Sequence, residues 1–376
     1  MSLSIDIRHR LGAFTLDAAF ETSGRLTALF GPSGSGKTTL VNLIGGLLRP
    51  DAGRIAAEGR VLVDTATSAF VPKHKRRIGY VFQDARLFPH LTVAQNLHYG
   101  RFFAPPSERH GDLDGVVDLL GIGHLLDRRP NALSGGEKQR VAMGRALLAS
   151  PRLILMDEPL ASLDDRRKAE IMPYIERLRD ETKVPIVYVS HSVAEVARLA
   201  TEMVVLDAGR VVASGPTAKI LQRLDLLPEE EQGESGAILD MRVASRDPAF
   251  GMATLASALG EIQVAGLDAE VGSHVRLRIR ARDVLVATER PRGLSALNIL
   301  PGTVLAVGAG DGPFADVQID CNGQTVTARI TRQSSHLLGL APGLAVFAVV
   351  KSVTFDRTNT ARAATSRAAT NTDGVG

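Results

Sequence analysis

The residues best suited to chemistry in this chain form the glycine-rich run Gly31-Pro32-Ser33-Gly34-Ser35-Gly36-Lys37-Thr38. It follows the apolar run Leu26–Phe30 and precedes another that starts at Leu40, so we expect a strand, a loop and a helix in this order. Glycines let successive backbone N–H groups turn inward at the start of the helix, which makes a concave anion site. Lys37 would contact the β- and γ-phosphates of a nucleotide, and the Thr38 hydroxyl would bind Mg²⁺. The run, with Thr39 beside it, therefore predicts an ATP-binding P-loop.

A second reactive pair, Asp157 and Glu158, ends the apolar run Leu153–Met156. A buried strand that ends in two carboxylates places them at the carboxyl edge of a sheet, where α/β folds bind ligands. Asp157 would hold Mg²⁺, directly or through water, and Glu158 would act as the general base on the attacking water. Carboxylates after a strand are also common helix caps. The nearby P-loop favours the catalytic interpretation.

A third candidate is the segment Leu133–Arg140, which precedes a helix-forming run. Ser134 and Glu137 have the spacing of a capping box. That box does not need the paired glycines Gly135 and Gly136, which would let a second phosphate approach the backbone. The segment resembles the signature motif of ABC ATPases. The resemblance implies that this loop closes over ATP held by the P-loop of a second copy.

Further segments match the same family in the same order. Gln83 matches the Q-loop glutamine, which contacts Mg²⁺ and senses the transmembrane partner, and Ala161–Asp164 matches the D-loop. His191 matches the switch histidine at the γ-phosphate, although a lone histidine after a strand is more often structural. Family members often stack the adenine on an aromatic residue before the P-loop. Phe14 is the candidate here, and it could equally be a core residue.

The resemblance covers roughly residues 1–225. It implies an α/β P-loop ABC ATPase domain, ATP and Mg²⁺ as cofactors, Glu158, His191 and Lys37 as catalytic residues, and a head-to-tail homodimer with two composite ATP sites.

The elements that must position these residues follow an α/β pattern up to residue 227. Short apolar runs have the length of strands, and helical patterns lie between several of them. Ile171, Ile175 and Leu178 keep helical spacing on one face, and Pro173 should kink or restart that helix. An acidic stretch flanked by Pro and Gly follows. We therefore predict a nucleotide-binding domain over residues 1–227 and a linker over residues 228–237.

Beyond the linker the sequence changes to short strands. The segment Val275–Arg280 alternates apolar and basic residues with period two, which is typical of a half-exposed strand. More strand candidates follow, separated by Gly-rich turns: Thr303–Val307, Ala315–Ile319, Thr325–Ile330 and Val346–Val350. We predict a small all-β barrel of the OB or MOP type over residues 238–355. Residues 356–376, which lack apolar periodicity, should be a disordered tail.

Three segments of this second half resemble the molybdate-binding barrel called the MOP domain, here over about residues 290–353: Ser295–Val304, Ala328–Thr331 and Val350–Ser352. Where that family usually has Ser-Ala-Arg-Asn, this chain has Leu297 in place of the Arg. Main-chain N–H groups and small hydroxyls suit a dianionic tetrahedral oxide, with a Lys supplying charge. The resemblance thus implies an oxyanion site made by Ser295, Asn298, Lys351 and Ser352. Whether the barrel binds molybdate or only supports the dimer stays open.

The segments Tyr80–His90 and Tyr188–Ser192, with the order of ATPase, linker and barrel, resemble the ATPase subunits of molybdate importers. The resemblance implies two transmembrane permease subunits and a periplasmic or extracellular substrate-binding protein as partners. Sulfate or thiosulfate, iron, polyamine and sugar importers share these features and remain alternatives. A soluble ABC ATPase of DNA repair or translation, or a molybdate-binding regulator with a vestigial cassette, fits less well, because the chain has one intact cassette.

Composition narrows the class of protein. The 376 residues carry a formal net charge of +3, which gives little support for nucleic-acid binding, and the basic run Lys73–Arg77 is interpreted as a solvated loop. The single cysteine, Cys321, excludes an internal disulfide. Asp6 and Arg8 interrupt any secretory signal, and the longest apolar stretch, Leu337–Val350, is shorter than the roughly 20 residues of a membrane span. We expect a peripheral protein on the cytoplasmic face of the plasma (inner) membrane.

Overall fold

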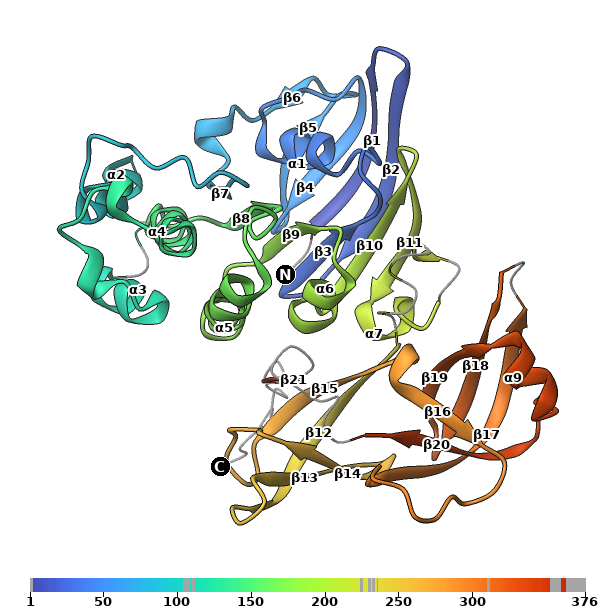
Figure 1. Ribbon diagram of the computed structural model, residues 1–376. Coiled ribbons are helices and arrows are strands. Elements are labelled where there is room, and N and C mark those ends of the chain that lie inside the picture. The colour runs from blue at the N-terminus through green and yellow to red at the C-terminus, as the bar shows by residue number, and fades with distance from the viewer. Residues whose placement is uncertain are drawn as a thin grey trace, which may run out of the picture.

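The computed structural model shows two lobes, and it describes residues 3–103, 109, 112–223, 226–228, 231, 234, 236–309, 312–351 and 360–362 (Figure 1). The N-terminal lobe, coloured blue to green, combines one large sheet with helices. The C-terminal lobe, coloured yellow to red, is built mainly of antiparallel strands. The predicted fold class, an α/β lobe of the P-loop type followed by a small β lobe, is confirmed.

An eleven-stranded sheet crosses the N-terminal lobe in the order β6-β5-β4-β1-β2-β11-β10-β3-β9-β8-β7. From β10 to β7 its strands are parallel. These strands are apolar along most of their length, because helices and neighbouring strands cover both faces. They are β3 (Leu26–Phe30), β7 (Ile78–Val81), β8 (Leu153–Asp157), β9 (Ile186–Ser190) and β10 (Glu202–Asp207).

The other half of the sheet is largely antiparallel and alternates buried and exposed residues, since one face of it meets solvent. Only β11 runs parallel to its neighbour β2 in this half. The strands are β1 (Leu3–Leu11), β2 (Phe14–Thr22), β4 (Ala52–Ala57), β5 (Arg60–Asp64), β6 (Ala69–Phe70) and β11 (Arg210–Pro216).

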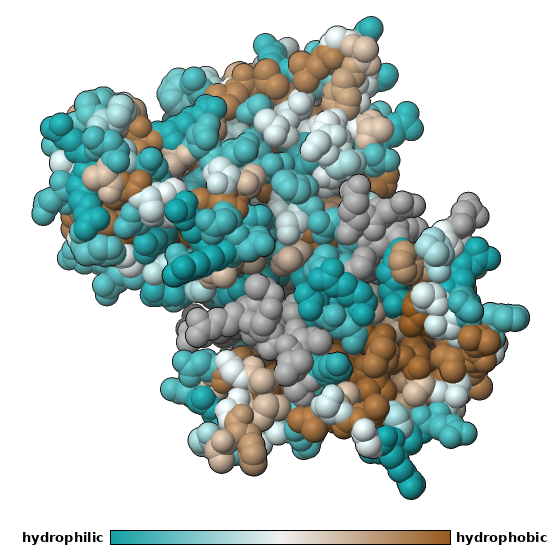
Figure 2. All heavy atoms as spheres, viewed as in Figure 1, coloured by the Kyte–Doolittle hydropathy of each residue, from teal (hydrophilic) through white to brown (hydrophobic). Residues whose placement is uncertain are grey.

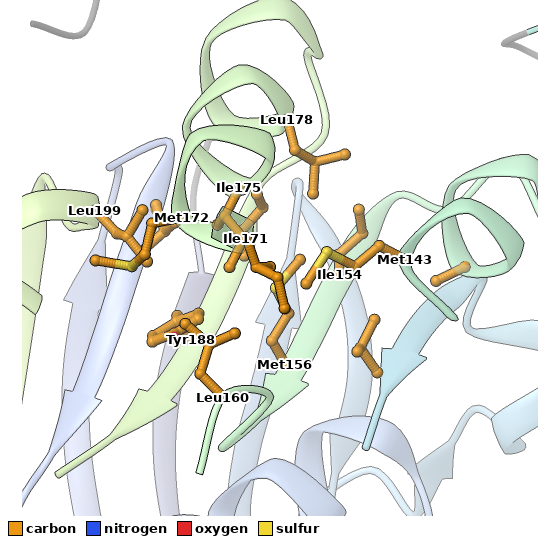
Figure 3. Packing of buried hydrophobic residues seen from close by; sticks show 14 of the residues in the cluster. Met143, Ile154, Met156, Leu160, Ile171, Met172, Ile175, Leu178, Tyr188 and Leu199 are labelled. Atoms are coloured by element: carbon orange, nitrogen blue, oxygen red, sulfur yellow. The ribbon is translucent and has the colours of Figure 1, made fainter. Parts of the chain in front are cut away.

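Helix α5 (Asp165–Glu181) covers the parallel strands with the face predicted from its spacing. Figure 3 shows Ile171, Ile175 and Leu178 of α5 above Ile154 and other core residues of the neighbouring strands, and all of these are buried. The helix continues through Pro173, so the expected restart is wrong. The buried isoleucines on either side of Pro173 hold the helix against the sheet across the missing hydrogen bond.

The remaining helices of this lobe are α1 (Lys37–Gly45), α2 (Val93–Phe103), α3 (Leu113–Leu120), α4 (Gly135–Leu148), α6 (Val193–Leu199) and α7 (Thr217–Ile220). Helix α1 ends against Arg76, which donates hydrogen bonds to the carbonyls of Leu43 and Ile44 at 2.8 and 2.7 Å. These are end-of-helix carbonyls that lack a partner within the helix. The interpretation of Lys73–Arg77 as a solvated loop is therefore wrong for Arg76, which is 2% exposed.

The C-terminal lobe contains two five-stranded antiparallel sheets. The first has the order β14-β13-β12-β15-β21, and the second has the order β16-β20-β17-β18-β19. Their inner faces share one apolar core. The elements are β12 (Gly236–Asp247), β13 (Met252–Ser257), β14 (Gly260–Ala265), β15 (His274–Arg280), β16 (Val284–Ala287), β17 (Asn298–Ala309), β18 (Phe314–Cys321), β19 (Gln324–Thr331), α9 (Arg332–Leu337), β20 (Ala345–Val350) and β21 (Thr360–Arg362).

Two expectations for this lobe need correction. The strand β15 was predicted to be half-exposed, but its arginines Arg276 and Arg278 have side chains only 12% and 6% exposed. They are buried because the N-terminal lobe and the segment after Leu227 lie over this strand. Residues 360–362 of the predicted disordered tail form β21, which pairs with the edge of β15. The rest of that tail lies outside the described residues.

The lobes contact each other along β12 and β15. Ile238 of β12 packs against the main core of the N-terminal lobe, and Arg276 of β15 donates a hydrogen bond to the carbonyl of Ala200 at 3.0 Å. Figure 2 shows apolar surface gathered on the C-terminal lobe over β16, β17 and β20. In the part of the chain that the structure describes, no helix is both long and apolar enough to cross a bilayer.

Candidate functional site

The predicted P-loop lies between β3 and α1, as its flanking runs indicated. Gly31 has φ 151° and approaches the neighbouring strand so closely that a Cβ would lie 2.0 Å from the Leu206 carbonyl oxygen. Gly36 has φ 103° and begins α1. Ser35 is buried, and its hydroxyl has no hydrogen-bond partner among the described residues. The loop therefore keeps backbone and side-chain donors at a helix N-terminus, where they can bind an anion.

Lys37 reaches back over the loop. Its ammonium group donates hydrogen bonds to the carbonyls of Gly31 and Pro32, both at 2.8 Å. Burial lowers the pKa of Lys37, while the nearby carboxylates of Glu158 and Asp157 act in the opposite direction. A buried cation is therefore held inside a loop of backbone donors, an arrangement suited to the charge of a polyphosphate.

Asp157, at the end of β8, joins the P-loop helix to the sheet. Its Oδ1 accepts a hydrogen bond from the Thr38 hydroxyl at 3.2 Å, and its Oδ2 lies 3.4 Å from the Tyr80 hydroxyl. Tyr80 also lies 3.2 Å from the Oδ1 atom of Asn42 on α1. Burial raises the pKa of Asp157, with Glu158 adding to the rise and the two hydroxyls opposing it. The Thr38 hydroxyl and the Asp157 carboxylate thus bring two oxygen atoms together, and oxygen is the ligand atom that Mg²⁺ prefers.

Glu158 follows directly and has a strained backbone. Its φ of 45° is unusual for a residue with a side chain, and such strain is characteristic of functional sites. Its Oε2 atom lies 3.6 Å from Nδ1 of His191, which follows β9. The Glu158 side chain is 24% exposed and that of His191 is 55% exposed. The parallel neighbours β8 and β9 end side by side, which explains how the two residues meet at one sheet edge.

The signature segment forms the N-terminus of α4. Ser134 is the N-cap and accepts a hydrogen bond from the Glu137 backbone N–H, while the Glu137 carboxylate accepts one from the Ser134 N–H at 2.7 Å. The predicted capping box is therefore confirmed. The described residues show no hydrogen bond or ion pair between Ser134–Gly136 and the P-loop of the same chain. The signature glycines are thus available at the start of a helix for a different anion.

Gln83 follows β7 as predicted, and its side chain is exposed. Its carbonyl accepts a hydrogen bond from the buried Gln139 side chain of α4 at 2.6 Å, and the Phe82 carbonyl accepts another at 3.2 Å. The Q-loop backbone is therefore tied to the signature helix. Sequence reasoning missed this role of Gln139, although its place within the signature segment was a usable signal.

Phe14, the predicted adenine contact, begins β2 beside the P-loop. Its ring packs so close to the backbone that a Cβ on Gly36 or Gly209 would lie about 3 Å from it. Phe14 is partly buried and packs against the core cluster that includes Leu16. The Phe14 ring therefore packs against the P-loop at Gly36, and only its exposed part is available to contact a base.

The predicted oxyanion residues that the structure describes lie at the adjoining ends of two neighbouring strands: Ser295 precedes β17, Asn298 begins it, and Lys351 follows β20. The register pairs Asn298 with Val350, so Lys351 follows beside the segment that begins at Ser295. Asn298 is 3% exposed and uses its amide structurally, because it accepts a hydrogen bond from Gln263 N at 2.7 Å and donates one to Gln263 O at 3.0 Å. Ser295 and Lys351 are exposed. Ser352 lies outside the described residues.

Sequence reasoning also missed Tyr80 and Glu195. Tyr80 belongs to a segment noted only for its family resemblance, and only the packing of β7 against α1 and β8 brings its hydroxyl to Asp157. Glu195 accepts hydrogen bonds from Tyr188 at 2.9 Å and Ser190 at 2.8 Å, which fixes the strand end that precedes His191.

Comparison with known proteins agrees with this arrangement. The family described as "ABC transporter" matches residues 20–161, and the TOBE domain matches residues 294–354. The "Molybdenum import ATP-binding protein ModC" of Mesorhizobium japonicum is 69% identical over 360 residues, with 96% of this chain and 97% of the relative covered. Proteins of the same name from Rhizobium etli and Rhizobium meliloti are 53% and 54% identical, with 95% of this chain and 100% of each relative covered.

Solved structures resemble the N-terminal lobe. The cbiO1 protein from Clostridium perfringens, described as part of the ABC transporter complex cbiONQ, has a TM-score of 0.50 at 26% identity, and the match covers 60% of this chain and 94% of that chain. A nucleotide-free ATP-binding cassette from an ABC transporter has a TM-score of 0.50 at 24% identity over 59% of this chain and 94% of that chain. The second likeness concerns the fold alone.

Proposed function

This chain belongs to the ABC transporter family, among the ATP-binding subunits of importers, and we propose that it hydrolyses ATP to power the uptake of molybdate. One observation supports molybdate as the cargo: relatives named for molybdenum import match almost the whole chain, including the C-terminal lobe, at up to 69% identity. The ATPase lobe alone does not distinguish cargoes, because importers of sulfate, iron, polyamines and sugars share it. Sulfate is the alternative that the experiment below tests.

The P-loop is the proposed binding site for the triphosphate. Backbone N–H groups from Gly31 to Thr39 would bind the phosphate oxygens, and Lys37 would neutralise charge on the β- and γ-phosphates. Mg²⁺, when bound, would polarise the phosphates and neutralise their developing charge. Thr38 and Asp157 would hold it, with Gln83 as a third oxygen donor. The hydrogen bond between Thr38 and Asp157, at 3.2 Å, supports this donor set.

Glu158 is the proposed general base. A carboxylate next to the γ-phosphate position can accept a proton from the attacking water, and the rigid, strained backbone at Glu158 fixes where that carboxylate points. His191, 3.6 Å from Glu158, would donate a hydrogen bond to the γ-phosphate and orient it for in-line attack. Both residues are partly exposed, so a water molecule has access to them.

A second copy of the chain is the proposed partner at the ATP site. Ser134, Gly135 and Gly136 would contact the γ-phosphate held by the P-loop of the other copy, which makes two composite sites in a homodimer. This proposal is supported by the helix N-terminus at Ser134, which makes no hydrogen bond to the P-loop of its own chain among the described residues. Phe14 is the proposed contact for the adenine.

Two permease subunits and an external substrate-binding protein complete the proposed transporter, with this chain at the cytoplasmic face of the inner membrane. We assign residues 1–227 to the nucleotide-binding domain, 228–237 to the linker and 238–355 to the regulatory β domain. The proposed oxyanion residues of that domain are Ser295, Asn298, Lys351 and Ser352.

Deletion of the coding sequence from its organism tests the function and the cargo together. We expect the loss of high-affinity molybdate uptake, measured with the labelled anion at nanomolar concentration, and its restoration by the wild-type chain but not by Glu158→Gln. Sulfate uptake measured in the same cells is the control. Unchanged molybdate uptake with lost sulfate uptake would replace the proposed cargo by the alternative. Restoration by Glu158→Gln would contradict the proposed dependence on hydrolysis.

A further inference from the structure

The helix that follows His191 is held at both ends by residues from beyond Leu227. This helix, α6 (Val193–Leu199), starts two residues after His191, and any shift of its first turn moves the loop that carries the histidine. Glu231, which lies after Leu227, contacts its N-terminal end, and Arg276 of strand β15 contacts its C-terminal end together with Arg179 of α5. The position of His191 therefore depends on parts of the chain that no ATPase motif includes.

Glu231 holds the N-terminal end of α6. Its Oε2 atom accepts a hydrogen bond from the Val193 backbone N–H at 3.1 Å. This N–H belongs to the first turn, whose donors have no partner within the helix. His191 is close enough to Glu231 to act on the pKa of its carboxyl, which burial raises and which the Val193 N–H and the His191 charge lower. Glu231 is thus a half-buried acceptor at the end of the histidine loop.

On its other side, the same loop is held by residues of the N-terminal lobe. The Ser192 N–H donates to the Ser190 hydroxyl at 3.0 Å, and the Ser190 hydroxyl donates to Glu195 at 2.8 Å. Lys168 of α5 forms an ion pair with Glu195 at 3.2 Å. The Ser192 hydroxyl also caps α6 by accepting from the Glu195 N–H at 3.4 Å. These contacts fix the end of β9 and one donor of the first turn of α6, and Glu231 accepts from another, the Val193 N–H.

The C-terminal end of α6 is held by Arg179 of α5, which donates to the Arg198 and Leu199 carbonyls, and by Arg276. The Arg276 guanidinium donates a hydrogen bond to the carbonyl of Ala200, the residue that caps the helix, at 3.0 Å. Arg276 is also paired with Asp240 of β12 at 3.6 Å, so it links α6 to two strands of the C-terminal lobe. A cation at this end of a helix also interacts favourably with the helix dipole.

The segment that carries Glu231 is itself fastened to the C-terminal lobe. Glu234, three residues on, pairs with Arg278 of β15 at 2.8 Å and also with Arg282. The Arg278 side chain is only 6% exposed, so this pair is not a loose surface contact. The C-terminal lobe is therefore connected to α6 at two points, through Arg276 at one end and through Glu234 and Glu231 at the other.

We propose that Glu231 is a positioning residue for His191: it holds the start of α6 so that the histidine loop stays beside Glu158. The inference rests on the proposed function, because it assumes that His191 acts on the γ-phosphate. It goes beyond the ATPase motifs, since it gives the segment after Leu227 a part in hydrolysis within the same chain. The geometry also shows what this contact requires. The Val193 backbone N–H needs a hydrogen-bond acceptor, and an uncharged acceptor would serve.

Steady-state ATP hydrolysis by the purified full-length chain tests this. Glu231→Ala removes the acceptor and should lower kcat about three- to tenfold, the range for one lost hydrogen bond. KM for ATP should change by less than about twofold, because the P-loop is untouched. Glu231→Gln retains an acceptor oxygen and should restore most of the activity. Asp268→Asn removes an exposed carboxylate of the C-terminal lobe and is the control, expected to behave as wild type.

A double-mutant cycle separates positioning from general destabilisation. In the background of His191→Ala, which should itself lose most activity, the added Glu231→Ala should have no further effect on kcat. An equal further loss in that background would overturn the proposal, and so would wild-type kcat in Glu231→Ala alone. Wild-type activity in His191→Ala would instead refute the role of the histidine in the proposed function. If Glu231→Ala does not fold, Glu231→Asp, whose carboxylate is one methylene shorter, provides the same test.

Discussion

Replacing Glu158 by Gln changes the proposed base by one atom and leaves its shape almost unaltered. The backbone at Glu158 has a φ of 45° that neighbouring structure imposes, and Gln accepts the same conformation at a similar cost. The substitution removes a negative charge that raises the pKa of Asp157 and that of Lys37. Asp157 therefore becomes more readily ionised, and the proposed Mg²⁺ ligand is preserved.

The magnitude follows from the role assigned to this carboxylate. A general base contributes roughly 10²- to 10⁴-fold in rate, which corresponds to about 2.7–5.4 kcal/mol of transition-state free energy. ATP affinity should change by no more than about twofold, because the loop donors and Lys37 are untouched. Stability should change by less than about 1 kcal/mol, since the Glu158–His191 pair at 3.6 Å has a half-exposed partner.

Three measurements on the same protein check these expectations: release of inorganic phosphate in single-turnover conditions, binding of a fluorescent ATP analogue, and the thermal midpoint. Glu181→Gln, the same chemical change at the exposed end of α5, is the matched control and should keep wild-type turnover. A Glu158→Gln variant that hydrolyses ATP within about threefold of wild type would refute the assignment of the base. Lost turnover together with lost ATP binding would show instead that Glu158 shapes the nucleotide pocket.

Other substitutions test the remaining sites. Ser134→Arg should reduce ATPase activity more than tenfold while single-subunit ATP binding persists. Ser134→Ala loses only about 1 kcal/mol of helix capping, so it distinguishes the steric effect of the Arg side chain from the loss of the cap. Unchanged hydrolysis in Ser134→Arg would contradict a composite site. The Ser134 N–H lowers the pKa of Glu137, so this carboxylate stabilises the fold above its unfolded pKa of about 4.3 and loses that contribution as pH falls through its lower folded value. Glu137→Gln should therefore lower the thermal midpoint at pH 7 and differ less from wild type near pH 3; a constant difference would refute this linkage. Leu297→Arg adds a cation at a 55% exposed position and should strengthen molybdate binding by the full-length chain roughly tenfold in calorimetry; no change would argue that the C-terminal lobe does not bind the anion there.

The arrangement within the nucleotide site illustrates where sequence reasoning reaches its limit. The P-loop, the carboxylates after β8 and the capping box at Ser134 were predictable, because each depends on neighbours within a few residues and on local backbone chemistry. The contact of Tyr80 with Asp157 was not predictable, since it depends on how β7 packs beside β8 and under α1. Asn298 illustrates the same limit: its motif suggests an anion ligand, and only the fold shows that its amide also joins β17 to β14.

The sequence by itself determined the fold class, the order of the lobes and which residues we propose bind and hydrolyse the nucleotide. These properties follow from hydrophobic periodicity and from short motifs whose geometry is local. Only the tertiary structure decided which distant residues support them: that Arg278 is buried rather than exposed, that Arg76 ends α1, and that Glu231 holds the helix after His191. The physical reason is that burial and pairing between separate elements depend on packing and register, which no short segment encodes alone.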